Sequence, residues 1–173
     1  MQRRQFIKSA VGVGIGLAVG SAVWTSIPSG EAPLTLAAAR DALARVMADN
    51  RASAGQWSLA MVFEHMAQSI EYSMLGYPDH KPAWFKATIG AGVFALFSEK
   101  GRMKHNLAEA IPGAPALSGT DVTLQYQRLQ ASIDAFEQYE GELQPHFAYG
   151  QLSKAQYVQA HVMHIFNHLE DVV

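Results

Sequence analysis

The chain has 173 residues, 49% hydrophobic and 16% charged, which is the composition of one ordinary globular domain. It contains no cysteine, so disulfides and cysteine nucleophiles are excluded and any metal ligands must be nitrogen or oxygen atoms. Arg3, Arg4 and Lys8 precede the first acid, Glu31, and without these three cations the chain holds 10 basic and 15 acidic residues. An acidic chain without a Lys/Arg cluster offers no surface for nucleic acid, so this class of partner is excluded.

Residues 1–30 have the layout of an export signal. Two arginines and a lysine precede residues 9–27, a stretch without charge that contains four glycines. The pair Arg3-Arg4, followed by Phe-Ile-Lys, resembles the twin-arginine export motif, which implies the twin-arginine export machinery as a partner and a periplasmic location. A membrane anchor is the alternative, because about 20 apolar residues can span a bilayer. No clean cleavage site is evident, and an uncleaved segment would hold the protein at the inner membrane.

Residues 31–173 are predicted to form a single helical domain after a linker at 29–33. Thr35 can cap a first helix that ends near residue 50. Ser58 can cap a second helix that extends to Met74, before the Gly-Tyr-Pro sequence that follows Leu75. The apolar residues of the first helix recur at helical spacing: Leu36, Ala39, Leu43 and Val46.

A third helix is predicted from Pro82 to Gly101, and residues 105–119, with two prolines and two glycines, are predicted to be a long loop. The apolar side chains expected to be buried in this third helix are Phe85, Ile89, Val93 and Phe97.

The fourth helix begins at Thr120 or Asp121 and ends at Gly141. Its apolar stripe consists of Val122, Tyr126, Leu129, Ile133 and Phe136. Ser153 and Gln156 form a capping-box pattern that begins a last helix. Since no alternating strand pattern occurs, the sequence predicts an all-α fold, an antiparallel helix bundle.

Three of the seven histidines lie in the last predicted helix, at positions 161, 164 and 168. At about 100° per residue they share one stripe that borders the apolar face. An i, i+4 pair such as His164 and His168 can direct two imidazoles at one ion. His65 also borders the apolar face of its helix, and it would supply a third ligand if the two helices are neighbours. Spacing alone leaves open that these are structural, hydrogen-bonded histidines.

Three segments resemble the DinB-like superfamily, in a branch of unknown function, and the likeness covers the chain from about residue 35 to its end. These segments are Trp57-Ser58-Leu59, the run from Phe63 to Met74, and the run from Phe147 to Lys154. The resemblance implies a four-helix bundle, here with an additional helical segment, that holds a divalent transition metal between three histidines. Carried over to this chain, the metal ligands are His65, His164 and His168.

The resemblance also implies that His161 lies one turn from the metal site. Where this branch often has two adjacent histidines, the chain has Asn167-His168, so the trio is intact but the fourth histidine has no counterpart there. Tyr72, two turns after His65, shares its face and is a candidate, with His161, to support the ligands.

No catalytic residue can be assigned, because Glu64 and Glu71 point away from the face that carries His65. The remaining histidines, His80, His105 and His146, fall in predicted loops or at helix ends and are expected at the surface.

Three functions follow from this pattern. The first is a metalloenzyme, a hydrolase or transferase acting on an unidentified small molecule with zinc or nickel as its ion. Some members of the superfamily are thiol transferases or isomerases, but a cytoplasmic thiol fits poorly with export. The second is a non-catalytic periplasmic metal-holding module. The third is a structural bundle whose histidines only form hydrogen bonds with one another. Each of them is compatible with a homodimer.

Overall fold

The computed structural model describes residues 29–173, and this part of the chain is helical, with only isolated β-bridges and no strand. The expected export signal lies outside the described residues, apart from its last two positions. The elements are α2 (Leu36–Ala48), α3 (Leu59–Leu75), α4 (Ala83–Phe85), the π-helical η1 (Lys86–Gly90), α5 (Ala91–Lys100), α6 (Val122–Gln138) and α7 (Lys154–Leu169). None of the described helices is long and apolar enough to cross a membrane.

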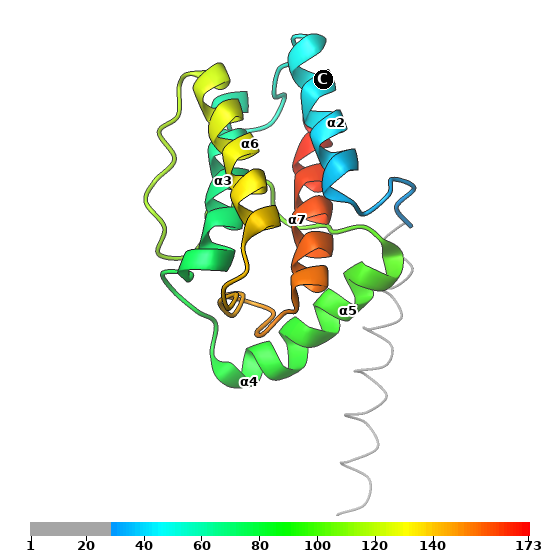
Figure 1. The fold of residues 1–173 in the computed structure, drawn as a ribbon, viewed down its shortest axis with the longest axis vertical. Coiled ribbons are helices and arrows are strands. Elements are labelled where there is room, and N and C mark those ends of the chain that lie inside the picture. The colour runs from blue at the N-terminus through cyan, green and yellow to red at the C-terminus, as the bar shows by residue number, and fades with distance from the viewer. Residues whose placement is uncertain (1–28) are drawn as a thin grey trace, which may run out of the picture.

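Four longer helices form the body of the molecule, and the helical segment from α4 to α5 lies across one end of it (Figure 1). Helix α3 packs against both α6 and α7, while α2 and α5 also contact α7. The space between them is filled by apolar side chains with at most 1% exposure, among them Phe63, Met66, Leu129, Ile133, Phe136, Val162 and Ile165. Helix α7 is therefore central, since it touches three other helices.

The helix starts predicted from capping residues are confirmed. The hydroxyl of Thr35 accepts a hydrogen bond from the Ala38 N–H, and the hydroxyl of Ser58 accepts one from the Met61 N–H. Ser153 and Gln156 form both bonds of the capping box at the start of α7. These local bonds satisfy amide groups that a helix cannot pair itself, so they mark the start of each helix from sequence alone.

The third predicted helix differs from its expectation at Ile89, which is half exposed instead of buried, and at Phe85 and Val93, which are only partly buried. The π-helical turn η1 adds a residue to one turn of this helix, and the faces after it rotate so that Phe94 and Phe97 are buried. Gly90 lies in this turn, and a Cβ there would collide with the carbonyl oxygen of Ala148. The helix thus packs directly on the backbone of the loop that precedes α7.

Candidate metal centre

Four histidines from three parts of the chain meet between α3, α7 and the loop after α5. A ligand nitrogen from each of His65, His105, His164 and His168 lies within 4.8 Å of those of the others. The Nε2 atom of His164 is 3.2 Å from Nε2 of His65 and 3.1 Å from Nε2 of His168. The two helices proposed to be neighbours therefore pack together, and the three histidines chosen from the sequence lie in one cluster with a fourth.

The local sequence explains how the helices present these rings. His164 and His168 are one turn apart on α7, so that both side chains leave the same face of the helix. His65 lies on the face of α3 that packs against α7, and only 2% of its surface is exposed. The indole of Trp57, just before α3, stacks on His168 and lies tilted against His65, so it forms an apolar wall over both rings.

His105 enters the cluster from the long loop between α5 and α6, contrary to the expectation of a surface position. The side-chain oxygen of Asn167 accepts the backbone N–H of His105 at 3.2 Å, which holds this part of the loop against α7. Asn167 is buried and directly precedes His168. Asn167 therefore positions a fourth histidine that comes from elsewhere in the chain.

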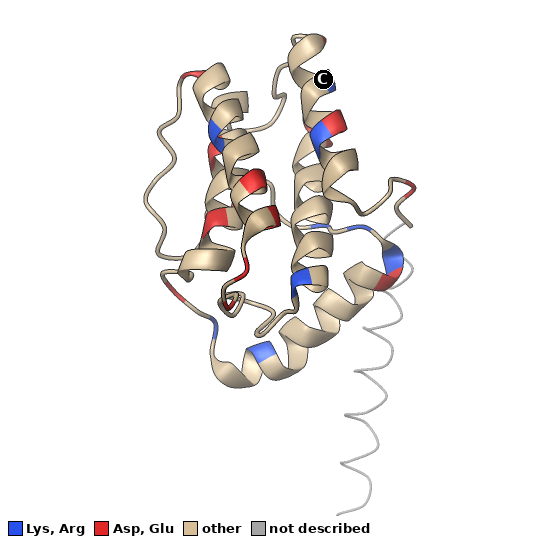
Figure 2. Ribbon diagram, in the orientation of Figure 1, with Lys and Arg blue, Asp and Glu red and all other residues tan. Residues whose placement is uncertain are grey.

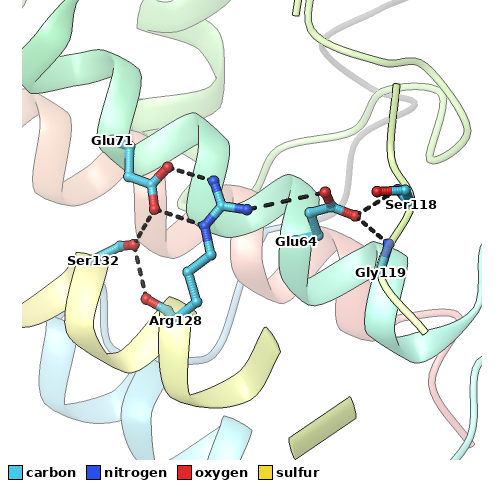
Figure 3. Close-up of polar contacts among 6 residues, drawn as sticks. All are labelled: Glu64, Glu71, Ser118, Gly119, Arg128 and Ser132. Carbon is cyan, nitrogen blue, oxygen red and sulfur yellow. Dashed lines mark hydrogen bonds and ion pairs between the residues drawn. The ribbon is translucent and has the colours of Figure 1, made fainter. Parts of the chain in front are cut away.

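The far end of the same loop is fixed by Glu64, the neighbour of His65. Its Oε2 accepts the backbone N–H groups of Ser118 and Gly119 at 2.9 and 2.7 Å (Figure 3). Charge-assisted bonds to backbone amides are stronger than neutral ones. Glu64 thus points away from the histidines, as the helical wheel predicts, and anchors the loop that carries His105.

Arg128 of α6 links this anchor to the second acid of α3. Its guanidinium donates two hydrogen bonds to Glu71, at 2.9 and 2.6 Å, and also lies 4.0 Å from Glu64 (Figure 3). Burial raises the pKa of Glu71, but the bonds from Arg128 and Ser132 more than offset it, so that the pKa is lowered and the carboxylate is charged. These contacts join α3 to α6 through a different face of α3 from the one that carries His65.

The clustered histidines are electrically neutral and offer lone pairs. Burial lowers the pKa of His65 to about 4 and that of His168 to about 2, with the neighbouring histidines as a second cause. Burial likewise lowers the pKa of His164 and His105. A neutral imidazole is the form that binds a transition metal, so no proton has to leave these rings near neutral pH.

The spacing of the nitrogens fits a bound ion. Imidazole nitrogens that share an ion at 2.0–2.1 Å, with angles between octahedral and tetrahedral, lie about 2.8–3.4 Å apart. The separations of 3.1 and 3.2 Å around His164 fall within this range. Since one nitrogen carries at most one proton, three Nε2 atoms this close satisfy one another poorly by hydrogen bonds alone, and an ion would accept a lone pair from each.

A cavity of about 220 Å³ adjoins the cluster. Three of the four histidines, His65, His105 and His164, contribute to its wall. Its apolar lining includes Phe85, Met103, Ile111 and Phe147. An ion at the cluster would therefore be accessible to a small molecule on one side and covered by Trp57 on another.

The other residues singled out from the sequence lie around this site. His161 is one turn before His164, and its Nε2 lies 3.2 Å from the Ser73 hydroxyl instead of joining the cluster. Tyr72 contacts the ring of Tyr77. His80 is exposed, as expected, whereas the expectation of a surface position is wrong for His146, which is 8% exposed. Sequence reasoning missed His105 and His146 because both lie in loops, where no periodicity indicates burial.

A family model described as "Protein of unknown function (DUF1569)" matches residues 34–173. The chain belongs to this family. The match covers every helix described above and all four clustered histidines. No curated protein and no solved structure matches the chain.

Two buried histidines outside the cluster should make this DUF1569 protein sensitive to acid. Burial lowers the pKa of His146 and of His161 to about 3, so both rings stay neutral in the folded protein at pH 5. In the unfolded chain they take up a proton below about 6.5. The unfolded state then binds more protons, and the free energy of unfolding should fall as the pH drops below 6.5, by about 2 kcal/mol per histidine at pH 5.

Urea unfolding at pH 7, 6 and 5 in the presence of a chelator measures the combined effect of these two rings and of the metal-free clustered histidines, whose pKa values are also lowered by burial. The range ends at pH 5 because most carboxylates titrate below it. An unfolding free energy that is equal at pH 7 and pH 5 would show that the two rings are protonated, and so accessible to water, in the folded state.

Proposed function

We propose that this protein binds one divalent transition metal ion through His65, His164 and His168, with His105 as a fourth ligand. The convergence of four neutral imidazoles within 4.8 Å carries the proposal. Zinc and nickel are the preferred ions, because imidazole is a poor ligand for hard cations such as calcium. The fold would be that of the DinB-like superfamily, with α2, α3, α6 and α7 as the four-helix bundle and the segment from α4 to α5 as the addition.

The cavity favours a metalloenzyme over a module that merely holds metal. A structural site is normally closed by its protein ligands, whereas catalytic sites keep a position open. Here the cavity reaches three of the four histidines. A bound ion would act as a Lewis acid toward a substrate oxygen or sulfur. We therefore infer a metal-dependent hydrolase or transferase that acts on a small molecule.

A non-catalytic metal-holding module is the second candidate. Four protein nitrogens suffice to complete a tetrahedral site, and the cluster supplies four. The two candidates differ in whether His105 stays bound when a small molecule enters the cavity. Loss of metal on removal of His105 is expected for a holding module, while an enzyme should keep its ion on the remaining three histidines.

Metal analysis of the protein, purified without a histidine tag from cells grown in metal-replete medium, tests the proposal. We expect close to one equivalent of zinc or nickel per chain. If the protein contains no transition metal and takes up none on dialysis against zinc or nickel, the proposal is wrong and the histidines form a purely structural cluster.

We further propose that the chain is exported by the twin-arginine route and acts in the periplasm. Changing Arg3 and Arg4 together to lysine keeps the positive charge but should abolish export, since the receptor of this route recognises the arginine pair. Cell fractionation measures the result, and a double change of Arg40 and Arg45 to lysine, within α2, is the matched control. If the variant with both N-terminal changes reaches the periplasm at normal levels, the segment is a signal of another kind.

A further inference from the structure

A part of the cavity wall outside the histidine cluster holds a second set of polar side chains. His146, Tyr149 and His161 line this side, and none of them belongs to the four clustered histidines. The cavity volume of about 220 Å³ corresponds to about seven water molecules at 30 Å³ each. This is small for a ligand site, so the molecule that fills it must be small.

His146 is locked in one tautomer by its own loop. Its Nδ1 accepts the backbone N–H groups of Ala148 and Tyr149, at 3.1 and 3.2 Å. A neutral imidazole whose Nδ1 is an acceptor carries its proton on Nε2. The ring is also stacked on Tyr149, with an interplanar angle of 7°. His146, which lines the cavity, therefore carries a fixed, uncharged Nε2–H donor that its hydrogen bonds within residues 29–173 do not use.

His161 has the same tautomer but a different use for its proton. The Ser73 hydroxyl donates to the carbonyl of Ile70 at 2.6 Å, so toward His161 it can only accept. The Nε2–H of His161 therefore donates its hydrogen bond to the Ser73 hydroxyl. Of the two buried histidines on this wall, His146 is the one whose proton is free for a ligand.

The charges around the cavity favour a negatively charged ligand. Residues 80–105, which supply Lys81, Phe85, Met103 and His105 to the wall, hold five basic residues and one acid. Figure 2 marks basic positions along the ribbon of this segment, and acidic positions on α3 and α6. Glu109 is the acid among the described lining residues, and Lys81 offsets it. A divalent ion among neutral imidazoles would add two positive charges, and the one carboxylate among the described lining residues is already offset by Lys81.

We propose that this cavity binds a small organic carboxylate. Its carboxylate group lies between the histidine cluster and His146, accepts the Nε2–H of His146, and its apolar part packs on Phe85, Met103 and Ile111. This assignment rests on the proposed metal site and deepens it, because it names the class of substrate that the site takes.

Binding of benzoate to the cobalt-loaded full-length protein tests the proposal. The visible absorption of cobalt reports on ligands near the ion without any need for activity. We expect a saturable change on titration with benzoate. His146→Asn keeps an acceptor for Ala148 and Tyr149 but removes the Nε2 donor, so the loop should stay folded while affinity falls roughly ten- to hundred-fold. His146→Gln places an amide near the Nε2 position and should recover part of the lost affinity. His80 is exposed, so His80→Ala should bind benzoate as tightly as the wild type.

The wild-type protein gives a second readout that needs no variant. The proton on Nε2 of His146 should be observable by NMR and should shift when benzoate binds. A cobalt-loaded wild type without a saturable response to benzoate would overturn the proposal, and so would His146→Asn binding benzoate as tightly as the wild type. Failure of the metal site itself looks different, because the protein would then bind no cobalt at all.

Discussion

Replacing His164 with alanine should remove the bound metal. Its Nε2 lies between those of His65 and His168, at 3.2 and 3.1 Å, so it is the central member of the cluster. The substitution removes the nitrogen that lies between the other two ligands and leaves a cavity between α3 and α7. We expect metal content to fall from near one equivalent to below a tenth, since each lost ligand weakens binding by at least the 10–100-fold typical of supporting residues. Metal analysis after dialysis against a defined free zinc concentration measures the change.

His161→Ala is the matched control for this substitution. It removes a buried histidine from the same helix, one turn away, but one that contacts Ser73 instead of the cluster. It should destabilise the fold while keeping most of the metal. Equal loss of metal from both variants would mean that the effect comes from damage to α7, and full retention by His164→Ala would exclude His164 as a ligand.

Replacing Ile133 with aspartate should unfold the domain or bring it close to unfolding. Ile133 is fully buried at the contact of α6 with α3. The substitution removes an apolar side chain from the core and places an unpaired charge there, at a cost of about 5 kcal/mol or more. Since whole domains are stable by about 5–15 kcal/mol, the melting temperature should drop steeply.

Ala131→Asp is the control for Ile133→Asp, because Ala131 is exposed on the same helix two residues away. It introduces the same charge without burial and loses more helix propensity than Ile133→Asp does, since alanine is the best helix former, and its effect should stay below about 1 kcal/mol. Thermal unfolding followed by circular dichroism compares the two. A melting temperature unchanged by Ile133→Asp would place α6 in the fold with another face toward the core.

The helices and their caps could be predicted from the sequence because they depend on neighbours within a few residues. Ser58 and Ser153 bond to amides three positions ahead, and the buried face of α6 follows from a spacing of 3.6 residues. Where a helix departs from this spacing, the prediction is wrong. Ile89 is exposed because η1 inserts a wider turn, and at this turn Gly90 packs against the Ala148 backbone.

Some residues of the candidate site could likewise be predicted from local sequence patterns, and others only from the tertiary structure. The i, i+4 spacing of His164 and His168, together with the position of His65 on its own apolar face, follows from helical periodicity and singles out three of the clustered histidines. His105 and His146 carry no such signal, because a loop has no period. His105 is held near the cavity by Asn167, which lies 62 residues away and accepts its backbone N–H. The bonds of His146 to Ala148 and Tyr149 are local, but the burial of its ring depends on distant residues such as Tyr77, which packs against it only in the folded chain.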